Sequence, residues 1–341
     1  MQYKRPNSYL GKALLVSPKM RVLVTGGAGF IGSEVVHQLC REGHQVIVLD
    51  NESSGRKEYI SSTPATFVAG DICDDKLSLR LLRRVDSVIH LAAYPFIPDC
   101  YDSPEEFFRV NAMGSVQLMW NCVVTKEIAR FVQISTSEVY GSSLCGEQAM
   151  DETHPTLPHS TYAASKLAAD RAAHTMCKEH GLPAVILRPF NSYGPRVTQP
   201  YIVPEIISQL SVSDQVSLGN TAASRDFTFV SDTANAILRA LTVEEAIGHT
   251  INIGSGKAVS IGELVQLIAK IMGKKCTIKH DSSRLRPNDV AKLKCCYDKA
   301  KKILGWTPTV PIEVGLKETV SWMLQNKVTF KAPFRAPWPA A

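Results

Sequence analysis

The sequence predicts an α/β protein with a doubly wound parallel sheet, followed by a smaller α/β part. Short apolar strands alternate with long helical patterns as far as Arg188, and a glycine-rich turn at residues 26–32 separates the first strand from the first helix. Parallel strands need long crossover connections, and helices of ten or more residues supply them. Ligands of such sheets bind at the carboxyl ends of the strands, where we therefore look for function.

Composition limits the classes of partner. The chain has 341 residues, of which 45% are hydrophobic and 21% charged, and its net charge is +6. This is typical of a globular protein with one large domain and an annex, or with two domains. There is no basic run and no nucleic-acid-binding motif, so we expect no nucleic-acid partner. We expect no membrane partner either, because no apolar stretch approaches the ~20 residues of a membrane span.

The ends of the chain and its cysteines carry less information. Residues 1–19 contain only a four-residue apolar patch, so they fail as a signal peptide and are interpreted as an N-terminal extension. Nine cysteines, an odd number without a C-x-x-C pair, favour a cytoplasmic protein without a disulfide framework. Neither they nor the nine histidines have the spacing of metal ligands, so we expect no metal site.

The first strand–turn–helix unit predicts a dinucleotide site. Residues 21–25 form a β-branched apolar strand, the glycines at 26, 29 and 32 follow, and a helical pattern begins after them. Glycines there allow a diphosphate to approach backbone N–H groups at the positive end of a helix. The second strand, residues 45–49, ends on Asp50, at about the separation at which an acid meets an adenosine ribose.

The rest of the chain is interpreted in order. The apolar runs predicted as further strands of the large sheet are residues 66–69, 86–90, 130–135 and 184–188. Two long helices are predicted at 104–126 and 161–180. After Arg188 the chain is rich in proline and glycine, and we assign short strands near 215–218, 227–230, 250–253 and 276–279 to the smaller part. The predicted domains are 20–188 and 189–330, partly interleaved, with a peripheral tail at 331–341.

Two polar patterns lie after this sheet's strands. Tyr162 and Lys166 are four residues apart on a predicted helix and therefore share a face. A neighbouring ammonium favours phenolate, so we expect Lys166 to lower the pKa of Tyr162 from about 10. Residues 135–141, with the sequence STSEVYG, directly follow a strand, which would direct their hydroxyls and the Glu138 carboxylate into the crevice of the glycine turn.

These motifs, with GDI at 70–72, HLAA at 90–93 and RPFNSYGPR at 188–196, resemble the extended short-chain dehydrogenase/reductase family. The family comprises NAD-dependent nucleotide-sugar epimerases, dehydratases and decarboxylases, and the resemblance covers residues 20–325. It implies a Rossmann domain that holds NAD tightly, with a nucleoside-diphosphate sugar beneath the second, substrate-binding domain. It also implies a homodimer formed through the two long helices.

The resemblance assigns the cofactor-binding positions. Gly26, Gly29, Phe30 and Ile31 match the positions at the pyrophosphate, and Asp50 matches the one at the adenosine ribose. An aspartate there repels a 2′-phosphate and favours NAD, although the nearby Arg56 and Lys57 leave NADP open. The remaining positions matched to the cofactor are Asn51, Ser54, Gly55, Asp71, Ile72, Leu91, Ala92, Ala93, Asn111, Tyr162 and Lys166.

The resemblance also assigns catalytic residues. Thr136, Tyr162 and Lys166 match the hydride-transfer triad, and Ser137 and Glu138 complete the predicted catalytic set. The Thr-Ser-Glu turn is similar to that of the 4,6-dehydratases, particularly the GDP-mannose type, whereas the dTDP-glucose type has aspartate in place of Ser137. A carboxylate at position 138 can remove the C5 proton beside a C4 ketone while the C6 hydroxyl leaves, which yields a 4-keto-6-deoxy sugar.

Later residues match the substrate side. Arg225 and Arg286 correspond to arginines that grip the substrate diphosphate, Asp289 to a position near the nucleoside ribose, and Asn191 to a further substrate contact. The late region most resembles dehydratases of UDP- or GDP-linked N-acetylhexosamines. Three alternatives stay open: a UDP-glucuronate decarboxylase, a 4- or 5-epimerase, and a non-catalytic protein that binds nucleotide sugar or NAD.

Overall fold

The computed structural model describes residues 19–144, 146, 148–285 and 289–328. Its centre is a seven-stranded sheet in the order β10-β6-β5-β4-β1-β2-β3, and every pairing in it is parallel. The strands are β1 (Arg21–Thr25), β2 (Gln45–Asp50), β3 (Thr66–Ala69), β4 (Ser87–His90), β5 (Arg130–Ile134), β6 (Ala184–Pro189) and β10 (Thr250–Ile253). This confirms the predicted doubly wound sheet.

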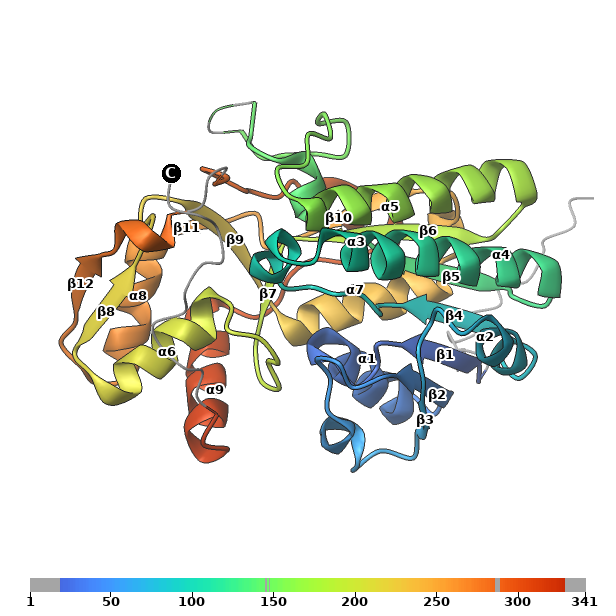
Figure 1. Cartoon of the computed structure of the whole chain (residues 1–341), viewed down its shortest axis with the longest axis horizontal. Coiled ribbons are helices and arrows are strands. Elements are labelled where there is room, and N and C mark those ends of the chain that lie inside the picture. Colours follow the sequence, from blue (N-terminus) through green and yellow to red (C-terminus); the bar gives the residue numbers. More distant parts are fainter. Residues whose placement is uncertain (1–18, 145, 147, 286–288, 329–341) are drawn as a thin grey trace, which may run out of the picture.

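Helices cover both faces of this sheet because its strands are apolar on both sides. In β1, Val22 and Val24 join one core cluster while Leu23 joins the other. The first cluster includes residues of α1 (Phe30–Arg41) and α7 (Val230–Thr242). The second includes residues of α2 (Asp75–Leu82), α4 (Ser115–Thr125) and α5 (Thr161–His180). Each strand side therefore packs on its own helical layer (Figure 1).

The smaller part lies at one end of the molecule and has its own core (Figure 1). A three-stranded sheet has the order β11-β9-β7, and β8 pairs with β12 in a two-stranded one. The strands are β7 (Asn191–Tyr193), β8 (Gln215–Leu218), β9 (Ser224–Phe229), β11 (Ala258–Ser260) and β12 (Thr277–His280). The helices are α6 (Ile202–Val212), α8 (Ile261–Ile271) and α9 (Ile312–Gln325).

One strand assignment is wrong. Residues 250–253 were expected in the smaller part, but β10 pairs with β6 at the edge of the large sheet. The reason is α7, whose apolar face packs on the large sheet beside α1 and so returns the chain to that sheet. The two parts are therefore interleaved along the sequence.

The helix predicted at 104–126 is continuous but not regular. It begins as α3 (Pro104–Phe107), passes through a π-helical segment at Phe108–Gly114 and ends as α4. The π segment contains the buried Asn111, whose amide bonds to the loop after β4 and to α5. Such π turns are frequent near functional sites.

Candidate active site

A single cleft of about 420 Å³ collects most of the residues that the sequence predicted. It runs along the carboxyl ends of β1, β2, β4 and β5, and its opposite wall comes from the smaller part. All predicted site residues among the described ones line it, except Gly55, Asn111 and Ser137. Arg286 lies outside the described residues.

The glycine turn forms a cradle that larger residues would fill. Gly26 has a positive φ of 71°, and a Cβ added to it would lie 2.6 Å from the backbone nitrogen of Ala92. A Cβ on Gly32 would lie 2.0 Å from the carbonyl oxygen of Gly26. Helix α1 begins directly after Gly29 without a side-chain cap, so its amino end faces the cleft with Phe30 and Ile31. These features fit a bound diphosphate.

Asp50 holds the loops on either side of this cradle. One carboxylate oxygen accepts from the N–H of Ala28 at 2.9 Å and the other from that of Glu52 at 2.8 Å. Burial raises the pKa of Asp50, although these two bonds oppose the shift. Gly55 is not part of the cleft lining. It packs closely against the glycine turn, since a Cβ added to it would lie 2.8 Å from the carbonyl carbon of Ala28.

Arg56 and Lys57, the two cations for which NADP stayed an alternative to NAD, do not line the cleft. The guanidinium of Arg56 lies over the ring of Tyr59 at 6.0 Å, and the ammonium of Lys57 lies over Phe67 at 5.3 Å. Near Asp50 the cleft lining therefore offers a ligand a carboxylate and neither of these two cations.

The rest of the cofactor wall combines lining and supporting residues. Asn51 donates from its amide to Asp71 at 3.2 Å, and both residues line the cleft with Ser54, Ile72 and residues 91–93. Asn111 is buried behind this wall, where its amide accepts from the N–H of Tyr94 at 2.8 Å and donates to Ser165 at 3.1 Å. Asn111 therefore positions the 94–98 loop rather than lining the cleft.

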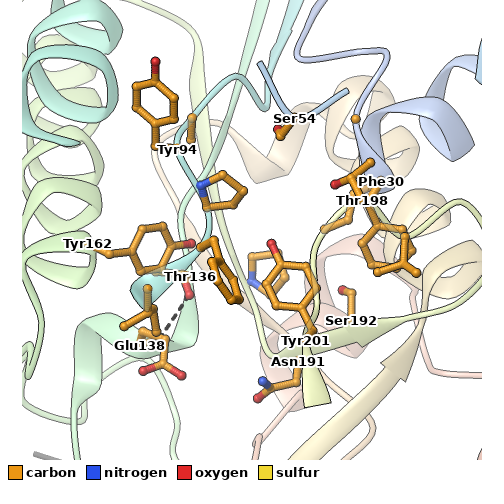
Figure 2. Close-up of a pocket in the computed structure, with 18 of the residues that line it drawn as sticks. Phe30, Ser54, Tyr94, Thr136, Glu138, Tyr162, Asn191, Ser192, Thr198 and Tyr201 are labelled. Atoms are coloured by element: carbon orange, nitrogen blue, oxygen red, sulfur yellow. Dashed lines mark hydrogen bonds between the residues drawn. The ribbon is translucent and has the colours of Figure 1, made fainter. Parts of the chain in front are cut away.

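The predicted catalytic residues meet where β5 ends. Thr136 caps the short turn Ser137–Tyr140 and accepts from the N–H of Glu138 at 3.2 Å. Tyr162 lies in the first turn of α5, and the nearby Thr136 side chain opposes the rise in its pKa. Figure 2 shows Tyr162, Thr136 and Glu138 together on one side of the pocket. A sugar carbon in front of them would face a phenol and a carboxylate at once.

Ser137 does not join this group. It is buried and lies outside the cleft lining, whereas its neighbours Thr136 and Glu138 line the cleft. The structure therefore does not bring Ser137 to the cleft beside Thr136 and Glu138, and its place in the catalytic set stays a prediction.

The expected effect of Lys166 on Tyr162 is also not found. The Lys166 ammonium is buried and donates to the carbonyl of Ile134 at 2.6 Å, and burial lowers its pKa to about 8. Burial raises the pKa of Tyr162, and the charge of Glu138 raises it further. Burial penalises charge on both groups, and it outweighs the attraction that the four-residue spacing predicts.

On the opposite wall, the substrate candidates cluster in the smaller part. Arg225 forms an ion pair with Asp289 at 3.2 Å, and Asn220 donates to the other oxygen of that carboxylate at 3.0 Å. The side-chain oxygen of Asn191 is buried and has no hydrogen-bond partner among the described residues. Asn191 and Arg225 are thus placed for a polar ligand.

Comparison with known proteins agrees with this geometry. The family model of GDP-mannose 4,6-dehydratase matches residues 23–319. A dTDP-glucose 4,6-dehydratase of Streptomyces niveus is 35% identical over 333 residues, which cover 93% of this chain and 96% of the relative. The chain belongs to the GDP-mannose 4,6-dehydratase family, within the extended short-chain dehydrogenases/reductases. The predicted family is thereby confirmed.

This family is not confined to dehydratases. A UDP-glucose 4-epimerase of Halalkalibacterium halodurans is 30% identical to this chain, covering 89% of it and 95% of the relative. Among solved structures, the dTDP-glucose 4,6-dehydratase DesIV of Streptomyces venezuelae, with NAD bound, has a TM-score of 0.83 and 31% identity, and covers 90% of this chain and 98% of that one. NAD is the cofactor that the sequence predicts here.

Some cleft residues of this family member were missed by sequence reasoning. Tyr94, Phe96, Tyr201, Glu205 and Arg284 all line the cleft, and Arg284 forms an ion pair with Glu205. Tyr94 and Phe96 lie in the loop after β4, and their place beyond the end of a strand could have predicted that they line the cleft. Tyr201 lies in the proline-rich stretch after Arg188, where nothing local indicates a direction for its side chain.

In the described part of the chain, no helix combines the length and the apolar character that a membrane span requires.

Proposed function

We propose that this protein is an NAD-dependent 4,6-dehydratase of a nucleoside-diphosphate hexose, a lyase, with a UDP- or GDP-linked N-acetylhexosamine as its substrate. The observation that carries the proposal is Glu138, which lines the cleft together with Thr136 and Tyr162. A simple exchange of hydride at C4 needs no carboxylate beside this pair, whereas removal of the C5 proton does. The dehydratase relatives of the chain support this choice.

The cofactor would lie along the wall built from the glycine cradle and Asp50. When bound there, NAD supplies a hydride acceptor for C4 and a hydride donor for C6. The amino end of α1 offers N–H groups to its diphosphate, and Asp50 has the charge that suits an unphosphorylated ribose.

Two side chains of the protein, Tyr162 and Glu138, carry out separate proton transfers. Tyr162 takes the proton of the C4 hydroxyl, and Thr136 lies beside it at the same side of the cleft. Lys166 lies one turn along α5 from Tyr162 and is protonated below about pH 8. Glu138 then takes the C5 proton, which the C4 ketone makes acidic. Arg225 and Asn191 hold the substrate from the opposite wall, and we assign Arg286 and Asp289 to the same task.

We further propose a cytoplasmic homodimer. Four large apolar side chains are exposed along the helix from α3 to α4: Phe108 at 43%, Met113 at 63%, Trp120 at 44% and Val124 at 48%. Large apolar side chains that are exposed on one helix favour burial against a second copy of the chain. The eight cysteines that the structure describes are free thiols, which suits a reducing compartment.

The test of the proposed reaction is a substrate panel with a product-mass readout. Purified enzyme is given UDP-, GDP-, dTDP- and CDP-hexoses and N-acetylhexosamines. Loss of one water from the product supports dehydration, loss of carbon dioxide indicates a decarboxylase, and an unchanged mass with altered stereochemistry indicates an epimerase. Absence of any turnover, together with tight binding, indicates a non-catalytic binding protein.

Glu138→Gln identifies the base. The amide keeps the shape of the side chain but not its basicity, so oxidation at C4 should survive while water elimination slows about 10²–10⁴-fold. Reduced nicotinamide should then accumulate and be visible by its absorbance. Glu313→Gln, an exposed acid in the first turn of α9, is the matched control and should leave the rate unchanged. Elimination by Glu138→Gln at the wild-type rate contradicts the assignment.

Tyr162→Phe should fail earlier in the reaction. Without the phenol no base faces the C4 hydroxyl, so neither product nor reduced nicotinamide should form. Appearance of reduced nicotinamide in this variant contradicts the role of Tyr162.

A further inference from the structure

Tyr201 lies where the smaller part meets the large sheet. It is the residue before α6, and its ring packs edge-on against Phe96 of the loop after β4, with ring centroids 5.9 Å apart. Both residues line the cleft. Tyr201 therefore reaches the site from the wall opposite Tyr162 and Glu138, as Figure 2 shows.

The hydroxyl of Tyr201 is directed into the cleft. In Figure 2 it points into the space bordered by Tyr162 and Thr136, and the two phenols are close enough to interact electrostatically. It has no hydrogen-bond partner within the described residues, although the interior tyrosines Tyr140 and Tyr193 each donate to a protein oxygen. A hydroxyl that faces a polar cleft without a partner is available to a ligand.

The proposed reaction needs an acid that the predicted catalytic set does not contain. When Glu138 removes the C5 proton, the C–H electron pair forms the C5=C6 double bond, and the C6–O bond breaks. The departing oxygen must gain a proton to leave as water. Glu138 is accepting a proton at that moment, Tyr162 is engaged at C4, and Ser137 is buried away from the cleft.

We propose that Tyr201 donates its phenolic proton to the departing C6 hydroxyl, so that this group leaves as water. This inference rests on the proposed dehydratase function. The phenolate left on Tyr201 regains a proton through water, and Tyr162 releases to water the proton that it took from the C4 hydroxyl, so these two transfers cancel before the next cycle. The carbon chemistry is balanced without another reactant, because Glu138 holds the C5 proton and Tyr201 supplies the one that leaves with the oxygen.

The environment of Tyr201 keeps it protonated until it is needed. Burial raises its pKa above the ordinary value near 10, and the neighbouring Tyr162 and Asp99 raise it further. A phenol is a stronger acid than water, so transfer of its proton to a departing hydroxide is favourable.

The experiment compares two leaving groups. The wild type and Tyr201→Phe are given UDP-N-acetylglucosamine, or whichever nucleotide sugar of the panel the wild type dehydrates, and its 6-deoxy-6-fluoro analogue. Fluoride leaves without a proton, so it does not need the acid. We expect Tyr201→Phe to oxidise C4, to accumulate reduced nicotinamide and to lose about 10²–10⁴-fold in water elimination, with little change in KM. Fluoride elimination should stay near the wild-type rate.

Two controls separate this role from a structural one. Tyr59→Phe alters a tyrosine outside the cleft lining, whose ring packs edge-on against Trp322, and it should be active on both substrates. Glu138→Gln should be slow on both, since both eliminations need the C5 base. Phenylalanine preserves the contact with Phe96, and circular dichroism checks the fold.

The possible outcomes are distinct. Dehydration of the natural sugar by Tyr201→Phe at the wild-type rate overturns the inference and leaves the proposed function intact. An equal loss with the hydroxyl and the fluoride substrate also overturns it, because the residue then acts through packing. If the wild type dehydrates no sugar, the proposed function fails first and the role of Tyr201 fails with it.

Discussion

Several buried polar side chains behind the cleft act through hydrogen bonds rather than by contact with ligand. His90, at the end of β4, is 1% exposed and lies between the hydroxyls of Thr25 at 2.6 Å and Ser115 at 2.8 Å. The Ser115 hydroxyl in turn donates to the carbonyl of Asn111. This chain of bonds joins the glycine turn to the π-helical segment. Because the Ser115 hydroxyl donates to Asn111, the Nε2–H of His90 donates to Ser115, and the Nδ1 of a neutral ring then accepts from the Thr25 hydroxyl.

The acid stability of the protein should therefore depend on His90. Burial, with a smaller contribution from the Lys166 charge, lowers the pKa of His90 to about 3. Between pH 6.5 and about 3 the unfolded chain binds a proton here that the folded chain does not. The free energy of unfolding should consequently fall as the pH falls through this window, by at most about 1.4 kcal/mol per pH unit from this residue.

Urea unfolding at a series of pH values tests this prediction. His90→Gln can bond to both hydroxyls but does not titrate, so its curve should fall less steeply than that of the wild type below pH 6.5. Above pH 6.5 the two curves should run parallel. Parallel curves over the whole range would show that His90 contributes nothing to acid unfolding.

At the scale of elements, the site depends on how closely α1 approaches the turn before it. Gly32 lies in the first turn of this helix, against Gly26. Because the neighbouring atoms belong to the backbone of the turn and not to a flexible side chain, they cannot move aside at a low energetic cost. The position of α1, and with it the amino end that faces the cleft, is set by the absence of a side chain at Gly32.

Gly32→Ala should therefore damage both stability and cofactor binding. We expect a loss of about 1–3 kcal/mol in the free energy of unfolding, as for overpacked cores, and loss of NAD during purification. Gly262→Ala in α8 is the matched control, since its Cβ would lie 3.6 Å from the nearest atom. It should raise the stability by up to about 1 kcal/mol, because alanine favours helix. Denaturant unfolding and the nucleotide content after denaturation measure both; equal behaviour of the two variants contradicts the prediction.

At the scale of the whole molecule, the two parts share one cleft, while the proposed dimer surface lies on a helical layer of the large sheet (Figure 1). The exposed apolar residues of the α3 to α4 helix lie beside α5, where Trp120 packs edge-on against His180 at 5.5 Å. Association through this layer would leave the cleft of each subunit uncovered by the other subunit. Dimerisation and substrate binding are thus spatially separate in our proposal.

Met113→Glu should produce a monomer. A carboxylate without a partner in a buried interface costs about 3 kcal/mol or more, which weakens association at least about 100-fold. Light scattering coupled to gel filtration gives the mass of the particle. Val212→Glu is the control, because Val212 is 82% exposed on α6 in the other part of the molecule, and that variant should remain a dimer. A dimeric Met113→Glu variant would place the interface elsewhere.

The sequence by itself determined the features that depend on neighbours along the chain. The strand, glycine turn and helix at residues 21–41 follow from local propensity and sterics, as does the placing of Tyr162 and Lys166 on one face of α5. The carboxyl ends of parallel strands meet at one edge of the sheet, so the gathering of Gly26, Asp50, Thr136 and Glu138 was predictable too.

Only the tertiary structure decided what depends on packing between distant segments. β10 joins the large sheet because α7 packs there, Ser137 is buried outside the cleft lining, and Tyr201 enters the cleft from the position before α6. The pKa of Tyr162 rises because burial outweighs the charge that the sequence places nearby. Burial and side-chain direction arise from contacts between residues that can be a hundred or more positions apart, and no local pattern encodes them.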